Sequence, residues 1–117
     1  MRHLKKGKKF GRLRGARISF MRNLANDLIR AGRITTTEAR AKAIRPQMER
    51  LVTFAKKQTL AARRELLSRV HNEKIVNKLY YDIGPRYAER HGGYLRITKL
   101  AKSRKRDGVR MARIEFV

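Results

Sequence analysis

The sequence contains no cysteine among its 117 residues. This absence excludes disulfide bonds and thiolate zinc sites, and it suits a reducing compartment such as the cytoplasm. No apolar run approaches the length needed to span a membrane. The basic first residues are not followed by the apolar segment of a secretory signal. We therefore expect a cytoplasmic protein with no membrane partner.

Acidic residues are also scarce, at nine Asp and Glu against 32 Lys and Arg. No two acids lie within four residues of each other, whereas metal-dependent nucleases hold their cations with clustered carboxylates. His3, His71 and His91 are isolated, and no glycine-rich nucleotide-binding motif is present. The sequence thus predicts no enzyme, no catalytic residue, no metal site, no cofactor and no small-molecule substrate.

The dominant feature of the composition is its net charge of +23. So much charge of one sign repels itself in a compact state and weakens the fold until a counter-charge arrives. A nucleic acid is the natural source of that counter-charge. Composition alone also permits a free-standing DNA-compacting protein. A cationic membrane-active protein and an RNA-processing enzyme fit less well, because the basic residues form no uninterrupted helix face and the acids are scattered.

Residues 1–17 are predicted to form a basic RNA-binding arm ahead of a single globular domain at 18–117. This segment has no acid, and glycines at every fourth position argue against a helix. Its three large apolar residues are too widely spaced to build a core, so we expect the arm to be mobile alone and to order along a phosphate backbone. Its cations are Arg2, Lys5, Lys6, Lys8, Lys9, Arg12, Arg14 and Arg17.

Apolar residues at helical spacing predict four helices, of which two precede residue 57. The first is expected to begin after Ser19 as its N-cap and to end at Gly32. The second begins near residue 36 or 37, because Thr35 and Glu38 have capping-box spacing. Pro46 is expected to kink or break this second helix.

The third helix is predicted from Thr59 to residue 70, with Leu60 and Leu67 among its inward residues. Asn72 is expected to cap the fourth helix, and Gly84-Pro85 to end it. We treat the apolar stripes of both helices as core positions and the arginines of the third helix as outward-facing.

The pattern changes to period two after the fourth helix, at residues 94–100 and 112–117. Between them lies a basic hairpin loop at 101–108 that contains the turn signal Asp107-Gly108. With residues 33–36 as a third strand, we predict an α+β fold. It is a two-layer α/β domain of about four helices on a small three-stranded sheet. The loop cations are Lys102, Arg104, Lys105 and Arg106.

Aromatic residues near basic ones are candidates for stacking on RNA bases. Tyr94, beside Gly92-Gly93, is the best such candidate, and packing in the core is an equally good interpretation of it. Paired-aromatic signatures of RNA-binding sheets are missing, so recognition of phosphate and shape fits better than base reading.

Short motifs follow one another along nearly the whole chain. They are Met1-Arg2-His3, Gly11-Arg12, Arg22-Asn23-Leu24, Ile34-x-Thr36-Thr37, Ala41-Lys42, Gly84-Pro85-Arg86-Tyr87, Gly92-Gly93-Tyr94-x-Arg96-Ile97 and Ala112-x-Ile114-Glu115-Phe116. In their order and spacing they resemble bacterial large-subunit ribosomal protein L-seventeen. Ala16 and Pro46 depart from that family, which usually has His at the first position and an uninterrupted helix at the second.

The resemblance implies a structural, non-catalytic protein of the large ribosomal subunit. It further implies binding to 23S ribosomal RNA on the solvent side, near the polypeptide exit tunnel, beside the ribosomal proteins L-twenty-two and L-thirty-two. Carried over by position, the motif residues become candidate RNA contacts. These are Arg2, His3, Gly11, Arg12, Arg22, Asn23, Arg86, Gly92, Gly93, Tyr94 and Arg96.

Overall fold

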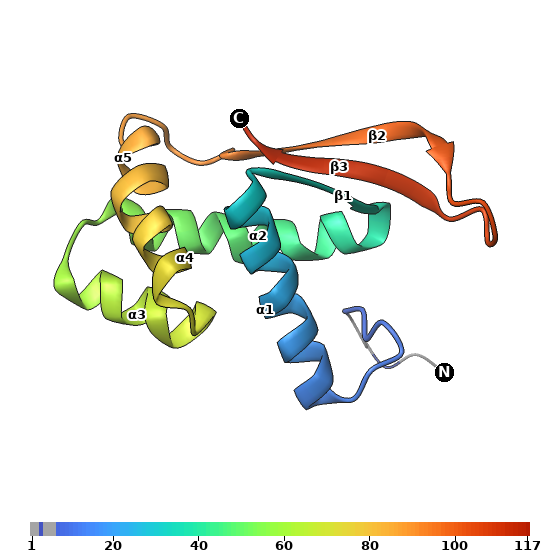
Figure 1. Cartoon of the computed structure of the whole chain (residues 1–117), viewed down its shortest axis with the longest axis horizontal. Coiled ribbons are helices and arrows are strands. Elements are labelled where there is room, and N and C mark those ends of the chain that lie inside the picture. The colour runs from blue at the N-terminus through green and yellow to red at the C-terminus, as the bar shows by residue number, and fades with distance from the viewer. Residues whose placement is uncertain (1–2, 4–6) are drawn as a thin grey trace.

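The computed structural model describes residue 3 and residues 7–117, and it has a helical layer packed on one face of a three-stranded sheet (Figure 1). Arg2, Lys5 and Lys6 of the predicted arm lie outside the described residues. Four helical segments pack on the sheet, as the sequence predicted for an α+β domain.

Helix α1 spans Arg14–Ala31 and therefore starts earlier than predicted. Its N-cap position is Leu13, which makes no side-chain cap, so the assignment of Ser19 as the N-cap is wrong. The glycine at position 15 lies within the helix and did not prevent it. The C-terminal end is confirmed, because Gly32 adopts a left-handed conformation and donates its N–H to the carbonyl of Leu28 at 2.8 Å.

Helix α2 spans Glu38–Lys56 and is the longest element of the fold. The hydroxyl of Thr37 accepts from the N–H of Arg40 at 3.2 Å, so Thr37 caps the helix. Thr35 lies in the preceding strand, and the predicted capping box is wrong. The helix runs on through Pro46, so a break there is wrong as well. Its buried face is formed by Ala41, Ile44, Met48, Leu51, Val52 and Ala55.

Helix α3 spans Leu60–Val70 and is capped by the Thr59 hydroxyl, as predicted. Leu66 and Val70 are buried, but Leu60 and Leu67 are 62% and 42% exposed and do not face inward. The small Ala62 lies on the buried face instead.

The last helical segment is continuous from α4 (Glu73–Lys78) through the π-helical η1 (Leu79–Ile83) to α5 (Gly84–Arg86). Asn72 caps it through bonds to two backbone N–H groups, as predicted. Gly84-Pro85 does not end it. Gly84 is buried, and a Cβ there would lie 2.6 Å from the Ala55 carbonyl oxygen. This glycine lets the segment approach α2 closely.

The sheet has strand order β1-β3-β2, formed by β1 (Arg33–Thr37), β2 (Leu95–Ser103) and β3 (Arg110–Phe116), all antiparallel. The pairing of β2 with β3 shifts register between Lys99 and Ser103, which places the irregularity on β2. The strands extend into the predicted loop. Only residues 104–109, which we call the hairpin tip, connect them in the described chain.

A single apolar core lies between the helices and the sheet. Ile114 of the central strand is fully buried, with Ile34 and Ile97 beside it on the neighbouring strands. Leu28 and Ile29 of α1, like Met48 and Val52 of α2, are fully buried in the same core. This core holds the sheet in one orientation and leaves its opposite face without a helical cover (Figure 1).

Candidate nucleic-acid interface

The uncovered face of the sheet carries arginine and threonine side chains around one acid, Glu115. Successive strand residues alternate between faces, so the neighbours of the buried Ile114 and Ala112 on β3 point away from the helices. The strand register then places the outward-facing residues of the three strands in two rows across the sheet. The rows are Arg33–Glu115–Arg96 and Thr35–Arg113–Thr98, and we call these six residues the outer sheet face.

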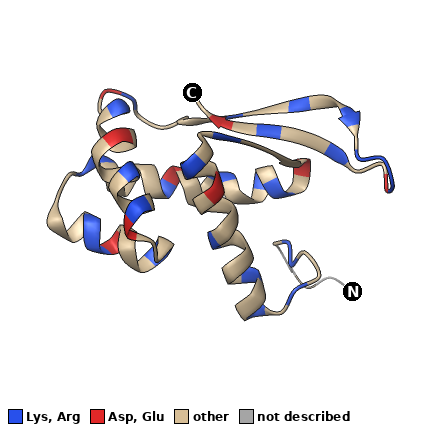
Figure 2. Cartoon of the chain, in the orientation of Figure 1, with Lys and Arg blue, Asp and Glu red and all other residues tan. Residues whose placement is uncertain are grey.

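The β2–β3 hairpin extends this basic surface beyond strand β1. β1 pairs with β3 only as far as Met111, and residues 101–108 beyond that point are all exposed. Figure 2 shows Lys and Arg along both strands of the hairpin and at its tip. The predicted residues Lys102, Lys105 and Arg106 lie here, with Lys102 on strand β2 rather than in a loop.

Arg104 differs from the other hairpin cations because it is paired. Its Nε donates to Oδ1 of Asp107 at 2.9 Å, and its terminal nitrogen pairs with the other carboxylate oxygen. This hydrogen bonding lowers the pKa of the Asp107 carboxyl to about 2. The backbone closes the same turn, where Arg104 N–H donates to the Val109 carbonyl at 3.0 Å. Arg104 therefore stabilises the turn at the hairpin tip.

The described part of the arm folds onto α1 and α2 through one aromatic residue. Phe20 of α1 contacts Phe10, with ring centroids 5.8 Å apart. The Arg12 guanidinium lies 4.0 Å above the Phe20 ring, and that of Arg40 lies 5.0 Å from it. Phe10 therefore packs at the edge of the core, and Arg12 holds the arm in place. His3, Lys8 and Lys9 remain exposed.

The predicted residues on the helices divide between exposed and engaged side chains. Arg14 and Asn23 of α1 are exposed, and Arg17 is half-buried. Arg22 bonds to Nδ1 of His71 at 3.0 Å. Arg86 holds both carboxylate oxygens of Asp82, at 3.1 and 3.0 Å, which leaves fewer of its donors for a phosphate.

Tyr94 lies in the core, which decides between the two interpretations of it. The residue is only 3% exposed, and its ring lies 5.3 Å from that of Tyr87. Its hydroxyl accepts from Nζ of Lys56 at 2.9 Å. Burial acts to raise the pKa of this phenol, but the hydrogen bonds from Lys56 and the Gly92 backbone produce a net lowering. No ring face is available for a base, so the stacking prediction for Tyr94 is wrong.

Sequence reasoning missed Arg33 and Arg113 as members of the basic surface. Alternation along residues 112–117 already placed Arg113 opposite the apolar positions, and this was a usable signal. The position of Arg33 beside Glu115 depends on the pairing of β1 with β3, which local patterning does not encode.

Six ion pairs occur in the part of the chain that the structure describes, and they leave most of the cations without an acid. Among the described residues, no group of three His, Asp or Glu side chains is arranged to hold a metal ion. Nor is any described helix long and apolar enough to cross a membrane. The surface is suited to bind phosphate through arginine and lysine.

Comparison with known proteins identifies the family of the chain. The family described as "Ribosomal protein L17" matches residues 20–117. Proteins named "Large ribosomal subunit protein bL17" align with the whole chain. That of Persephonella marina is 51% identical over 95% of its own length. Those of Dehalococcoides mccartyi and Thermus thermophilus are 46% and 44% identical, each over 99% of its length. The chain therefore belongs to the ribosomal protein L17 family and is a structural, non-catalytic constituent of the large ribosomal subunit in the bacterial cytoplasm.

Proposed function

We propose that this chain binds 23S ribosomal RNA near the polypeptide exit tunnel and stabilises the folded RNA by neutralising phosphates. The main observation that supports this proposal is that the outer sheet face and the hairpin present basic side chains with no helix over them. The position near the tunnel, beside the proteins L-twenty-two and L-thirty-two, comes from the resemblance to the family alone.

The outer sheet face would sit along the sugar–phosphate backbone. Arginine presents a planar fork that bonds a phosphate through two N–H groups, and Arg33, Arg96 and Arg113 provide three such forks on one surface. The threonine hydroxyls of the second row add donors between them. Such a surface recognises the course of the backbone rather than a base sequence.

The hairpin and the arm would reach RNA elements beyond that surface. The hairpin carries three exposed cations beyond strand β1, namely Lys102, Lys105 and Arg106. Such side chains can insert between phosphate backbones. We also assign RNA contacts to the cations of the arm, including Arg2, Lys5 and Lys6, because of their charge and the family resemblance. Further contacts are assigned to exposed or half-buried residues of the arm and α1, namely His3, Lys8, Lys9, Arg14, Arg17 and Asn23.

Salt titration of binding to a large-subunit fragment of 23S RNA tests the proposal. If about 6–10 phosphates are engaged, log K falls with log salt at a slope of roughly −5 to −9. Replacing Lys102, Lys105 and Arg106 together with Gln should make that slope shallower by about 2 to 3. The matched control replaces three exposed cations outside the hairpin and removes the same net charge: Arg64 of α3, Lys74 of α4 and Arg90 in the loop after α5.

The control triple variant should keep a steeper slope than the hairpin variant. Equal slopes would show that RNA responds to net charge and not to this surface, and a salt-independent affinity would remove the electrostatic mechanism. Duplex DNA competing as well as the ribosomal fragment would instead favour a general nucleic-acid-compacting activity.

A further inference from the structure

The outer sheet face holds one carboxylate that does not pair with the cations around it. Glu115 stands on the central strand β3, between Arg33 of β1 and Arg96 of β2. None of the ion pairs in the part of the chain that the structure describes involves Glu115. Both arginines are exposed, whereas Glu115 is half-buried and has lost part of its hydration. A surface that binds only phosphates gains nothing from a carboxylate at this position, because like charges repel.

The six residues of the outer sheet face form an ordered pattern of charge. Neighbouring strands lie about 4.8 Å apart, so the Cα atoms of Arg33 and Arg96 are separated by roughly 10 Å across β3. The first row therefore has a cation at each end and an acceptor, Glu115, in the middle. The second row has a threonine hydroxyl at each end and a cation, Arg113, in the middle. A ligand that matches this face must offer donors as well as acceptors.

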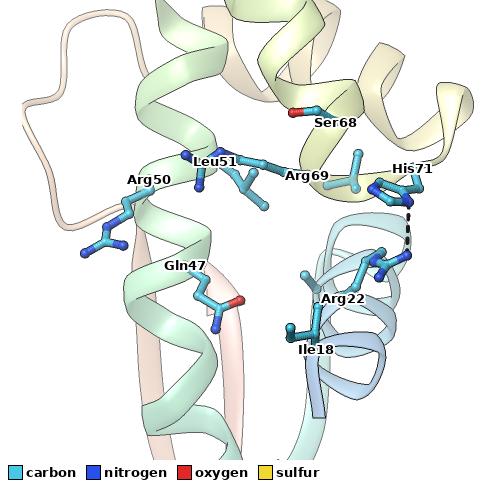
Figure 3. Close-up of a pocket in the computed structure, with 10 residues that line it drawn as sticks. Ile18, Arg22, Gln47, Arg50, Leu51, Ser68, Arg69 and His71 are labelled. Carbon is cyan, nitrogen blue, oxygen red and sulfur yellow. Dashed lines mark hydrogen bonds between the residues drawn. The ribbon is translucent and has the colours of Figure 1, made fainter. Parts of the chain in front are cut away.

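A cleft of about 500 Å³ between α1, α2 and α3 lacks such a pattern. Figure 3 shows the Arg50 guanidinium turned away from this cleft, and Arg22 bonds to Nδ1 of His71 at 3.0 Å. Arg69 pairs with Glu65 at 2.8 Å. The arginines at this cleft are therefore engaged or directed elsewhere, whereas those of the outer sheet face are not held by an acid.

The minor groove of a double-helical RNA offers the pattern that complements the outer sheet face. It is wide and shallow, and it displays 2′-hydroxyls and base edges between the two phosphate backbones. Guanine presents an N2 amino donor there, and the other polar atoms of the base edges are acceptors. Arginines at the ends of a row then meet phosphates, threonine hydroxyls meet 2′-hydroxyls, and Arg113 meets a base acceptor. The guanine amino group is the donor that remains for Glu115.

Other nucleic acids fit this face less well. Proteins that bind single strands stack bases on aromatic rings, and none of the six residues of the outer sheet face is aromatic. The minor groove of B-form DNA is only about 6 Å wide and too narrow for the row. We infer that the outer sheet face binds the minor groove of double-helical ribosomal RNA, with Glu115 accepting a hydrogen bond from a guanine amino group. The inference rests on the proposed RNA-binding function and adds one base-pair preference to a surface that otherwise follows the shape of the RNA.

Affinity for two short RNA duplexes tests the groove and the acceptor together. One duplex has alternating G·C pairs, and the other has inosine in place of guanosine and so lacks only the N2 amino groups. At a temperature where both stay paired, the wild-type chain should bind the G·C duplex about tenfold more tightly, because inosine removes a hydrogen bond to a charged acceptor. Equal affinities would overturn the assignment, and this comparison leaves the protein unaltered.

The variant Glu115→Ala separates hydrogen bonding from simple repulsion, because the two predict changes of opposite sign. If Glu115 accepts from guanine, the variant should bind the G·C duplex more weakly and lose the preference over inosine. If Glu115 only repels phosphates, the variant should bind both duplexes more tightly, and that result would overturn the inference. Glu89→Ala is the charge-matched control, since Glu89 is an exposed acid in the turn after α5. This control should keep the preference for the G·C duplex.

Amide NMR of the full chain distinguishes failure of this inference from failure of the proposed function. The G·C duplex should shift the resonances of Arg33, Arg96 and Glu115, and B-form DNA of the same sequence should shift them less. Shifts confined to the hairpin and the arm would overturn the inference while the proposed function stands. If no RNA shifts any resonance, the proposed function fails and the inference with it. Shifts at Glu115 produced by a lysine-rich peptide and not by duplex RNA would assign the face to a neighbouring protein and would also overturn the inference.

Discussion

The helical layer and the β2–β3 hairpin carry their positive charge in different ways. In the helices, acids stand three or four residues from a basic partner, as in Asp27–Arg30, Glu65–Arg69 and Asp82–Arg86. The described hairpin has two acids: Asp107 pairs with Arg104 at the tip, and Glu115 lies on β3 near its other end, while Lys99 of β2 pairs with Glu38 of α2. The few acids of this sequence are therefore concentrated where the fold is built, and the hairpin keeps its charge for a partner.

The same two regions differ in what holds them together. The helices and the sheet beneath them share one buried core, whereas residues 101–108 are exposed without exception. Exposed ion pairs contribute little to stability, so the hairpin tip depends on its turn and on its continuity with the sheet. We expect substitutions in the helical layer and its sheet to affect folding, and substitutions in the hairpin to affect binding. The following changes test that division.

The largest expected difference is between two residues at opposite ends of the hairpin. Ile114→Ala removes a fully buried side chain from the centre of the sheet and should lower the free energy of unfolding by about 2–5 kcal/mol. Val109→Ala, at the half-buried base of the tip, should lower it by less than about 1 kcal/mol. Urea denaturation measures both. Similar losses would show that the tip belongs to the same core.

A smaller effect separates two glycines of the helical layer. Gly84→Ala would place a Cβ 2.6 Å from the Ala55 carbonyl oxygen and push α5 away from α2, at a cost of about 1–3 kcal/mol. Gly15→Ala, in α1, meets no atom within 4 Å and should stabilise by about 0.5–1 kcal/mol through helix propensity. Thermal unfolding followed by circular dichroism measures both. A neutral Gly84→Ala would mean that α5 shifts freely.

Gly84 also shows where sequence patterns stop being informative. Gly-Pro is a common helix end, and nothing local to residues 84–85 indicates that α2 passes beside them. By contrast, the caps at Thr59 and Asn72 and the end at Gly32 were predictable, because capping is decided by bonds within a few residues. Features set by local chemistry could be predicted from the sequence, whereas contacts between distant segments could not.

The candidate interface shows the same division between residues that local sequence predicts and residues whose positions depend on distant contacts. The cations of the hairpin were predictable from a run of basic residues beside a turn signal. The core position of Tyr94 was not, because it depends on Lys56 and Tyr87, which are distant in the sequence.

The smallest expected effect concerns the single ion pair of the hairpin tip. Arg104 lowers the pKa of Asp107 from 3.8 to about 2, so folding of the tip should gain from this pair above about pH 4 and lose that gain as the pH falls toward 2. An NMR titration should show the Gly108 and Val109 amide resonances moving in this range while resonances of the helical core stay fixed. Asp107→Asn should abolish the movement. A midpoint at the ordinary value of the carboxyl would mean that the pair does not form in solution, and the tip would then offer Arg104 to RNA as freely as Lys105 and Arg106.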